Sequence, residues 1–281
     1  MAATSKDTSN ISGNGGPLHK HTFLFVGDSG LNASIPELLT SAIARETKEM
    51  ITIARRRIWL FSSKGLVVRS REASLRDKCL PYAHNFERCD TLLDAINKIK
   101  PTVLIGAADC PMIFKEDIIN AMAKHNKNPI IMSASNPAVG PHEVERGEDV
   151  MRWTQNRGIF IPAKLEKEYR LGGHLYHHRG LSSAYVSPGI ALGALLSGLT
   201  SLREDHFLQA AETVASCVTD DDRRQGSYYP HIDACRKVAI RVAHNVMTKS
   251  YEMGLATNTR PDDIEKEIRS YMYQPMYRLY R

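Results

Sequence analysis

The sequence predicts an α/β fold: a Rossmann-like, doubly wound parallel sheet followed by a C-terminal helical segment. Short runs that are apolar throughout alternate with helix-length amphipathic segments, and beyond about residue 184 only the helical pattern continues. Strands without polar alternation are buried on both faces, which requires helices above and below a parallel sheet. We therefore expect a flexible Ser/Asn/Gly-rich tail at 1–17, a Rossmann domain at 18–184 and a helical region at 185–281.

The individual elements follow from the spacing of apolar residues. The expected strands are Thr22–Val26, Ile58–Phe61, Thr102–Ile105, Pro129–Met132 and Gly158–Ile161. The helical patterns that follow these strands or lie between them are 35–43, 91–99, 115–124 and 142–154. A Gly- and His-rich segment at 165–180 is typical of a hairpin. Further helices are expected at 189–199, 207–215, 238–246 and 262–273.

Composition excludes several classes of protein. The 281 residues are 42% hydrophobic and 24% charged, values typical of a globular chain. The net charge of +6 is spread along the chain, so we expect no nucleic-acid partner. The longest apolar run, Gly189–Leu199, is too short to span a bilayer, so we expect no membrane partner.

Cysteine usage points to a reducing compartment. Five cysteines at irregular spacings argue against both a disulfide framework and a zinc site. We expect a cytoplasmic protein; a mitochondrial location is the alternative, although no clear transit peptide is present. Cys110 follows a predicted strand but has no evident histidine partner, so we interpret it as an inert thiol.

Three clusters of polar residues have structural interpretations. The basic run Arg55–Arg57 precedes an apolar segment and is interpreted as a solvated strand entry, and the acidic run Asp220–Asp222 as a solvated junction. A group of histidines could suggest a metal site: His142, His174, His177 and His178. It lacks the helical i,i+4 spacing of metal-binding histidines, so no metal ligands are predicted.

The first strand-to-helix turn reads Gly27-Asp-Ser-Gly-Leu-Asn-Ala33. In a dinucleotide-binding fold, a Gly-rich turn here lets backbone N–H groups approach the pyrophosphate at a helix N-terminus. Ser29 replaces the middle glycine of the G-x-G-x-x-G/A pattern, and the Asp28 carboxylate opposes a phosphate unless it points away. Taken alone, the motif fits an ordinary turn as well as a phosphate site.

Several longer stretches of the sequence match segments of a known protein family, and they occur in the same order and with the same spacing as in that family. They are Thr22-Phe-Leu-Phe-Val-Gly27, Ile58-Trp-Leu-Phe-Ser-Ser-Lys-Gly-Leu66, Lys100-Pro-Thr-Val-Leu-Ile-Gly106, Asn128-Pro-Ile-Ile-Met-Ser-Ala-Ser-Asn-Pro137, Tyr185-Val-Ser-Pro-Gly-Ile-Ala-Leu-Gly193 and Tyr229-Pro230. From about residue 18 to about 250 the sequence resembles the C-terminal, NAD(P)-binding half of the malic enzymes, which oxidatively decarboxylate malate to pyruvate.

The resemblance implies a set of cofactor-binding positions. These are Gly27, Gly30, Ser63, Lys64, Gly106, Ala107 and Asn136. Other family positions are altered: Ser62 replaces an acidic residue that would bind the adenine ribose, and Cys79 aligns with a lysine that favours NADP. Leu181-Ser-Ser-Ala-Tyr185 replaces a Gly-Asn-Asn-x-Tyr segment whose asparagines reach substrate and nicotinamide.

The family's catalytic tyrosine and lysine and its acidic metal ligands belong to its N-terminal half, so the resemblance implies no catalytic and no metal-binding residue here. Our leading hypothesis is an inactive relative that acts as a structural or interaction subunit of a larger assembly. A protein partner or a second copy would cover the helical face at 188–246. In this hypothesis no cofactor is required, and NAD or NADP binds weakly. The alternatives are an NAD(P)-binding sensor module, or an oxidoreductase that is completed in trans or comes from an incomplete gene model.

Overall fold

The computed structural model describes residues 16–28, 31–108, 113–135 and 146–273. The chain divides into two compact units. The first, which we call the α/β unit, comprises Met1–Ser182 and Val218–Tyr229, and the second, the helical unit, comprises Ser183–Cys217 and Pro230–Arg281. The division is not a single cut in the sequence, because residues 218–229 return to the α/β unit.

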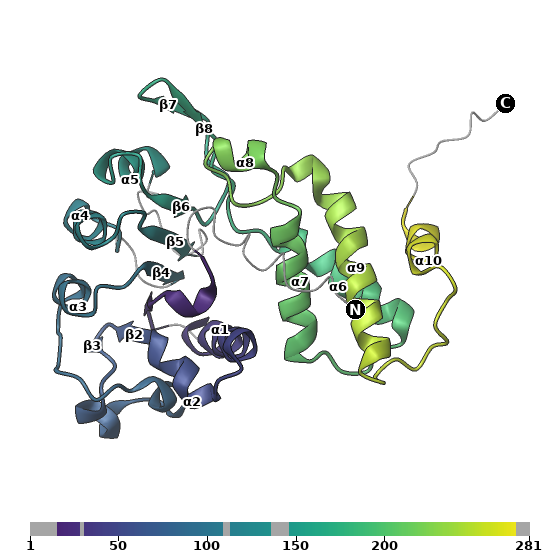
Figure 1. Ribbon diagram of the computed structural model, residues 1–281, viewed down its shortest axis with the longest axis horizontal. Coiled ribbons are helices and arrows are strands. Elements are labelled where there is room, and N and C mark those ends of the chain that lie inside the picture. The colour runs from purple at the N-terminus through teal and green to yellow at the C-terminus, as the bar shows by residue number, and fades with distance from the viewer. Residues whose placement is uncertain (1–15, 29–30, 109–112, 136–145, 274–281) are drawn as a thin grey trace. The chain divides into compact units, whose positions relative to one another are not determined.

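The main sheet of the α/β unit has the strand order β3-β2-β1-β4-β5-β6 (Figure 1). Its strands are β1 (Phe23–Val26), β2 (Ile58–Ser62), β3 (Gly65–Leu66), β4 (Val103–Ala108), β5 (Ile130–Ser135) and β6 (Ile159–Ile161). All neighbouring pairs are parallel except β2 and β3. The predicted Rossmann-like fold is confirmed. The antiparallel edge strand β3 was not predicted; it forms because Gly65, at φ +99°, reverses the chain.

Helices cover both faces of this sheet. They are α1 (Leu31–Thr47), α2 (Ile51–Ala54), α3 (Leu92–Ile99), α4 (Glu116–His125) and α5 (Gly147–Trp153). Leu24 and Val26 of β1 belong to the core beneath α3, α4 and α5. Phe23 and Phe25 alternate with them and belong to a second core with Ile43 of α1. Burial on both faces explains why this strand contains no polar residue.

A hairpin lies in the segment where the sequence predicts one. Strands β7 (Tyr169–Leu171) and β8 (His174–Tyr176) pair in antiparallel fashion. The short helix α8 (Asp220–Arg224) belongs to the same unit. His174 Nε2 lies 2.6 Å from the carbonyl oxygen of Arg224, and the amide of His177 donates to the carbonyl of Gln225 at 2.8 Å. These bonds fix residues 218–229 to the α/β unit.

The acidic run that forms the first turn of α8 is not uniformly solvated, which corrects the sequence interpretation. Asp222 is buried and forms an ion pair with the buried Arg179. Its carboxylate also accepts from the amide and the hydroxyl of Thr219, at 2.9 and 2.7 Å. Burial alone would raise the pKa of Asp222, but the hydrogen bonds from Arg179 and Thr219 hold it below its ordinary value. The charge is stable in the interior because its lone pairs are satisfied.

Replacing Asp222 by Asn leaves Arg179 buried without its counter-charge. We expect Asp222→Asn to lower the free energy of unfolding by about 3 kcal/mol, measured by urea denaturation at pH 7. Asp221→Asn is the matched control, because Asp221 and its partner Arg224 are 79% and 74% exposed. Its cost should stay below about 0.5 kcal/mol. Equal effects of the two substitutions would contradict the assignment of the buried pair.

The helical unit is built on α6 (Ser187–Ser197), α7 (Glu204–Ser216), α9 (Cys235–Glu252) and α10 (Ile264–Tyr271). The apolar face of α9 is buried inside this unit, with Val238, Val242 and Val246 each no more than 1% exposed. Large apolar side chains that remain exposed include Leu195, Phe207 and Ile232. Within the described residues, no helix has the combination of length and apolarity that a bilayer crossing requires.

Candidate functional site

The predicted cofactor-binding edge forms where three parallel strands end together. Val26 of β1 is in register with Phe61 of β2 on one side and with Gly106 of β4 on the other. The strand order reverses between β1 and β4, and this switch point is where open α/β sheets bind ligands at the carboxyl ends of their strands. The pairing therefore brings Gly27, Ser63, Lys64 and Gly106 to one edge.

The remaining predicted positions are only partly described. Ala107 continues β4 and pairs with Ala134 of β5. Gly30 and Asn136 lie outside the described residues, as do Cys110 and His142.

The carboxylate of Asp28 points towards the end of β2. Its two oxygens lie 3.1 and 3.3 Å from the backbone nitrogen of Ser63, which donates to them. Arg76 Nη1 donates to the backbone carbonyl of Asp28 at 3.0 Å. The turn after β1 is thus tied to the turn after β2 through a charged side chain. Sequence reasoning identified Asp28 as unfavourable for a phosphate but did not find these partners, which lie 35 and 48 residues away.

The polar groups next to Asp28 also form hydrogen bonds within their own turn. The Ser62 hydroxyl donates to the carbonyl of Gly65 at 3.1 Å and accepts from the amide of Lys64 at 3.3 Å. Gly106 has a packing reason to be glycine, since a Cβ there would lie 2.8 Å from Cζ of Phe114. Burial raises the pKa of the Cys79 thiol, so this position, which aligns with the family's lysine, is neutral at pH 7.

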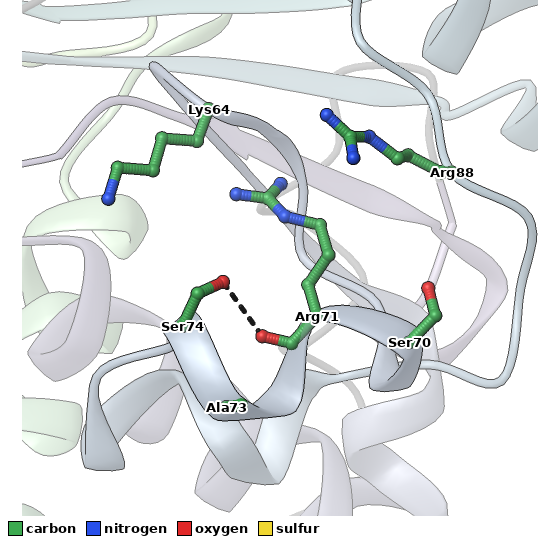
Figure 2. A pocket seen from close by; sticks show the side chains of 6 residues that line it. All are labelled: Lys64, Ser70, Arg71, Ala73, Ser74 and Arg88. Carbon is green, nitrogen blue, oxygen red and sulfur yellow. Dashed lines mark hydrogen bonds between the residues drawn. The ribbon is translucent and has the colours of Figure 1, made fainter.

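A cationic pocket lies beside this edge and was not predicted beyond Lys64. It has a volume of about 570 Å³ and is lined by Lys64, Ser70, Arg71, Ala73, Ser74 and Arg88. Figure 2 shows the three cationic side chains around it, with the Ser74 hydroxyl bonded to the carbonyl of Arg71 at 2.9 Å. Arg71 Nη1 donates to the carbonyl of Leu66 at 2.9 Å, and Arg88 pairs with Asp90 at 2.6 Å. The pocket suits an anionic group.

The three described histidines of the candidate metal cluster have separate partners. His178 Nδ1 lies 2.8 Å from the carbonyl oxygen of Gly226, so it carries the proton and Nε2 accepts from the hydroxyl of Tyr169 at 2.7 Å. Burial lowers the pKa of His178 to about 4, so the ring is neutral. His177 faces Glu168. No group of three metal-ligating side chains occurs in the described part of the chain.

A partly buried carboxyl group lies next to this histidine, and the sequence analysis did not identify it. Glu166 accepts from the backbone amide of Gly147, with Oε1 at 2.9 Å and Oε2 at 3.1 Å. Burial raises its pKa from 4.5 to about 7, and the nearby Asp149 adds to the shift while the Gly147 amide opposes it. No sequence pattern marks this residue, because its environment is assembled from segments that are distant along the chain.

The raised pKa of Glu166 predicts that stability depends on pH. Between pH 4.5 and 7 the folded state keeps a proton on Glu166 that the unfolded state releases, so this group's stabilising contribution is lost as pH rises through 7. Glu166→Gln removes the titration. We expect its free energy of unfolding, relative to the native chain, to improve by about 1–2 kcal/mol from pH 5 to pH 8. Glu72→Gln, at an exposed position, serves as control, and a pH-independent difference for Glu166→Gln would refute the shift.

Fold and edge together define a dinucleotide-binding type of α/β protein, and comparisons with known proteins give the family. The family model "Malic enzyme, NAD binding domain" matches residues 2–251. The chain therefore belongs to the malic enzyme family, of which it contains the NAD-binding domain.

Two plant relatives support this family assignment. The chloroplastic NADP-dependent malic enzyme of Oryza sativa subsp. japonica is 40% identical over 268 residues, which cover 95% of this chain and 42% of the rice protein. NADP-dependent malic enzyme 1 of Arabidopsis thaliana is 38% identical, covering 94% and 45%. The chain thus spans less than half the length of these relatives.

A solved structure supports the fold. The malic enzyme from Pyrococcus horikoshii Ot3 superimposes with a TM-score of 0.64 at 16% identity, covering 91% of this chain and 54% of that one.

Proposed function

We propose that this chain is a malic-enzyme relative whose nucleotide edge does not hold NAD(P) in a catalytic position, and that it serves as an interaction subunit. The observation that carries the proposal is the pair of hydrogen bonds from the Ser63 amide to the Asp28 carboxylate. The carboxylate occupies the turn at which a dinucleotide's pyrophosphate would meet the fold, and it engages an amide at the same edge.

Repulsion between like charges disfavours a dinucleotide at this turn. A dinucleotide brings negative phosphates to this turn, and the Asp28 carboxylate repels them with an energy of about 1–4 kcal/mol at 4 Å, depending on the local dielectric. Rotating the side chain away would break its bonds to Ser63, so avoiding the repulsion also has a cost. Ser62 offers no carboxylate to an adenine ribose, and its hydroxyl is engaged in the turn. These residues do not fit the cofactor in its usual position.

The interaction role has separate support. Although the apolar face of α9 is buried within the helical unit, Leu195 and Ile232 remain 69% and 52% exposed. Near the end of the described chain, Tyr271 and Tyr273 are 62% and 69% exposed. Large apolar side chains at the surface are candidates for burial in an interface. We propose a second copy of the chain or another protein as the partner that covers them.

One observation favours a second candidate function, an NAD(P)-binding sensor. The pocket around Lys64, Arg71 and Arg88 presents cations beside the end of β2, and Lys64 has no side-chain partner among the described residues. An extra phosphate such as that of NADP carries the charge that such a pocket favours. The relatives in rice and Arabidopsis are named as NADP-dependent. In this alternative, NADP binds without turnover.

Removing the Asp28 carboxylate tests the proposal. We expect Asp28→Ala to bind NADP at least about tenfold more tightly than the native chain in isothermal titration, because it removes the repulsion and frees the Ser63 amide. Asp77→Ala removes the same charge from an exposed position nearby and should leave the affinity unchanged. The native chain should produce no NADPH or NADH with malate and Mg²⁺.

Two results would contradict the proposal or shift it to an alternative. Micromolar NADP binding by the native chain without turnover would favour the sensor, and malate-dependent NADPH production on mixing with a full-length relative would favour completion in trans. Light scattering tests the interaction role, for which we expect a mass above the 31.4 kDa of one chain. A monodisperse monomer with no associated protein in native purification would exclude that role.

A further inference from the structure

A second basic pocket lies at the opposite end of β2 from the nucleotide edge. It has a volume of about 660 Å³, within the range of small-ligand sites. Its walls come from α2, the turn Arg55–Arg57, the first residues of β2, Arg69 and the segment 80–85. It shares no lining residue with the pocket around Lys64. The five-residue strand β2 separates the two ends by roughly 16 Å.

The positive charge of this pocket is only partly compensated. Three arginines line it and no acidic residue does. Arg55 is paired with Glu37 at 2.7 Å, but its buried Nε has no hydrogen-bond partner in the described part of the chain. Within the described residues, the side chain of Arg69 makes one long bond, from Nε to the carbonyl of Ala83 at 3.4 Å. The side chain of Arg56 is exposed and has no polar partner among the described residues. Arg56 and Arg69 are therefore available to an anion.

The same pocket has an ordered aromatic wall. Trp59 stacks on His84 with ring centroids 3.7 Å apart and an interplanar angle of 11°, and Phe86 packs against it edge-on. His84 Nε2 lies 2.8 Å from the carbonyl oxygen of Ile58, which fixes the imidazole. Burial lowers the pKa of His84, so the ring is neutral and the positive charge comes from the arginines alone. Trp59 is only partly buried, which leaves part of its surface accessible.

Together these features correct the interpretation of the basic run as a solvated strand entry. Arg55 and Arg57 are half-buried and paired with Glu37 and Glu49, whereas Arg56 is directed to solvent beside an aromatic platform. Guanidinium groups match phosphate oxygens with paired donors, and planar rings stack on tryptophan. A ligand that carries both a phosphate and a flat ring would use both walls.

We propose that this pocket binds a phosphate monoester bearing a planar aromatic ring, of the nucleoside monophosphate class, with the phosphate held by Arg56 and Arg69 and the ring against Trp59. Thr52 and Asn85 line the same pocket and supply hydrogen-bonding groups for the polar parts of such a ligand. The site is separate from the dinucleotide edge, so it does not depend on whether that edge binds NADP.

Tryptophan fluorescence gives a direct test, because the chain has 2 Trp residues. In a Trp153→Phe background, Trp59 is the sole reporter. We expect AMP to change its emission saturably below about 1 mM, with adenosine and inorganic phosphate each binding at least about tenfold more weakly. Arg56→Gln with Arg69→Gln should weaken AMP binding at least about tenfold; both side chains are exposed, and circular dichroism verifies folding.

The matched control removes two charges from the other pocket. Lys64→Gln with Arg88→Gln should leave the AMP affinity within about twofold. Three results would overturn the proposal: no saturable response to AMP at 10 mM, an equal loss of affinity in the control variant, or inorganic phosphate binding as tightly as AMP. The first would exclude a site, the second would reveal non-specific attraction, and the third would exclude a role for the ring.

Discussion

Strand β1 lies between β2 and β4 in the sheet, and this parallel pairing determines where the functional groups of the α/β unit stand. Because Phe23–Val26 is in register with Ile58–Phe61 and with Val103–Gly106, the chain must leave all three strands at the same edge. That edge brings Asp28, Ser63 and Gly106 together. The opposite end of β2 receives Arg55 and Arg56, so the two basic pockets belong to opposite ends of one buried strand.

Asp28 is the residue on which our proposal for the use of this fold rests. Strand β1, which leads into this turn, is apolar and buried throughout, so the frame that presents the turn is intact. Within that frame the carboxylate accepts from the Ser63 amide instead of leaving the edge open to a phosphate. The fold of the family persists because it depends on packing beneath the sheet. The binding of a dinucleotide depends on a few polar groups above the sheet edge, and in our proposal Asp28 is the group there that disfavours it.

The sequence predicted the fold well because burial on both faces leaves a simple pattern. The apolar runs around Leu24, Leu104 and Ile131 predict the strands correctly, since these side chains are fully buried. It predicted the site less completely. Three features of the site depend on contacts between segments that are far apart in the chain. They are the bonds of Asp28, the buried pair of Asp222 and Arg179, and the environment that raises the pKa of Glu166. Periodicity describes one element at a time, so it carries no information on such contacts. Edge strand β3 was missed because two residues are too few to show a pattern.

In our proposal the Ser63 amide donates to the Asp28 carboxylate and does not bind a dinucleotide. Amide NMR of the ¹⁵N- and ²H-labelled chain tests it at a single atom, by following the Ser63 and Gly27 resonances during titration with NADP to millimolar concentration. We expect a Ser63 amide that exchanges slowly with solvent, loses this protection in Asp28→Ala, and is not shifted by NADP in the native chain. A saturable NADP-dependent shift of both amides in the native chain would contradict it.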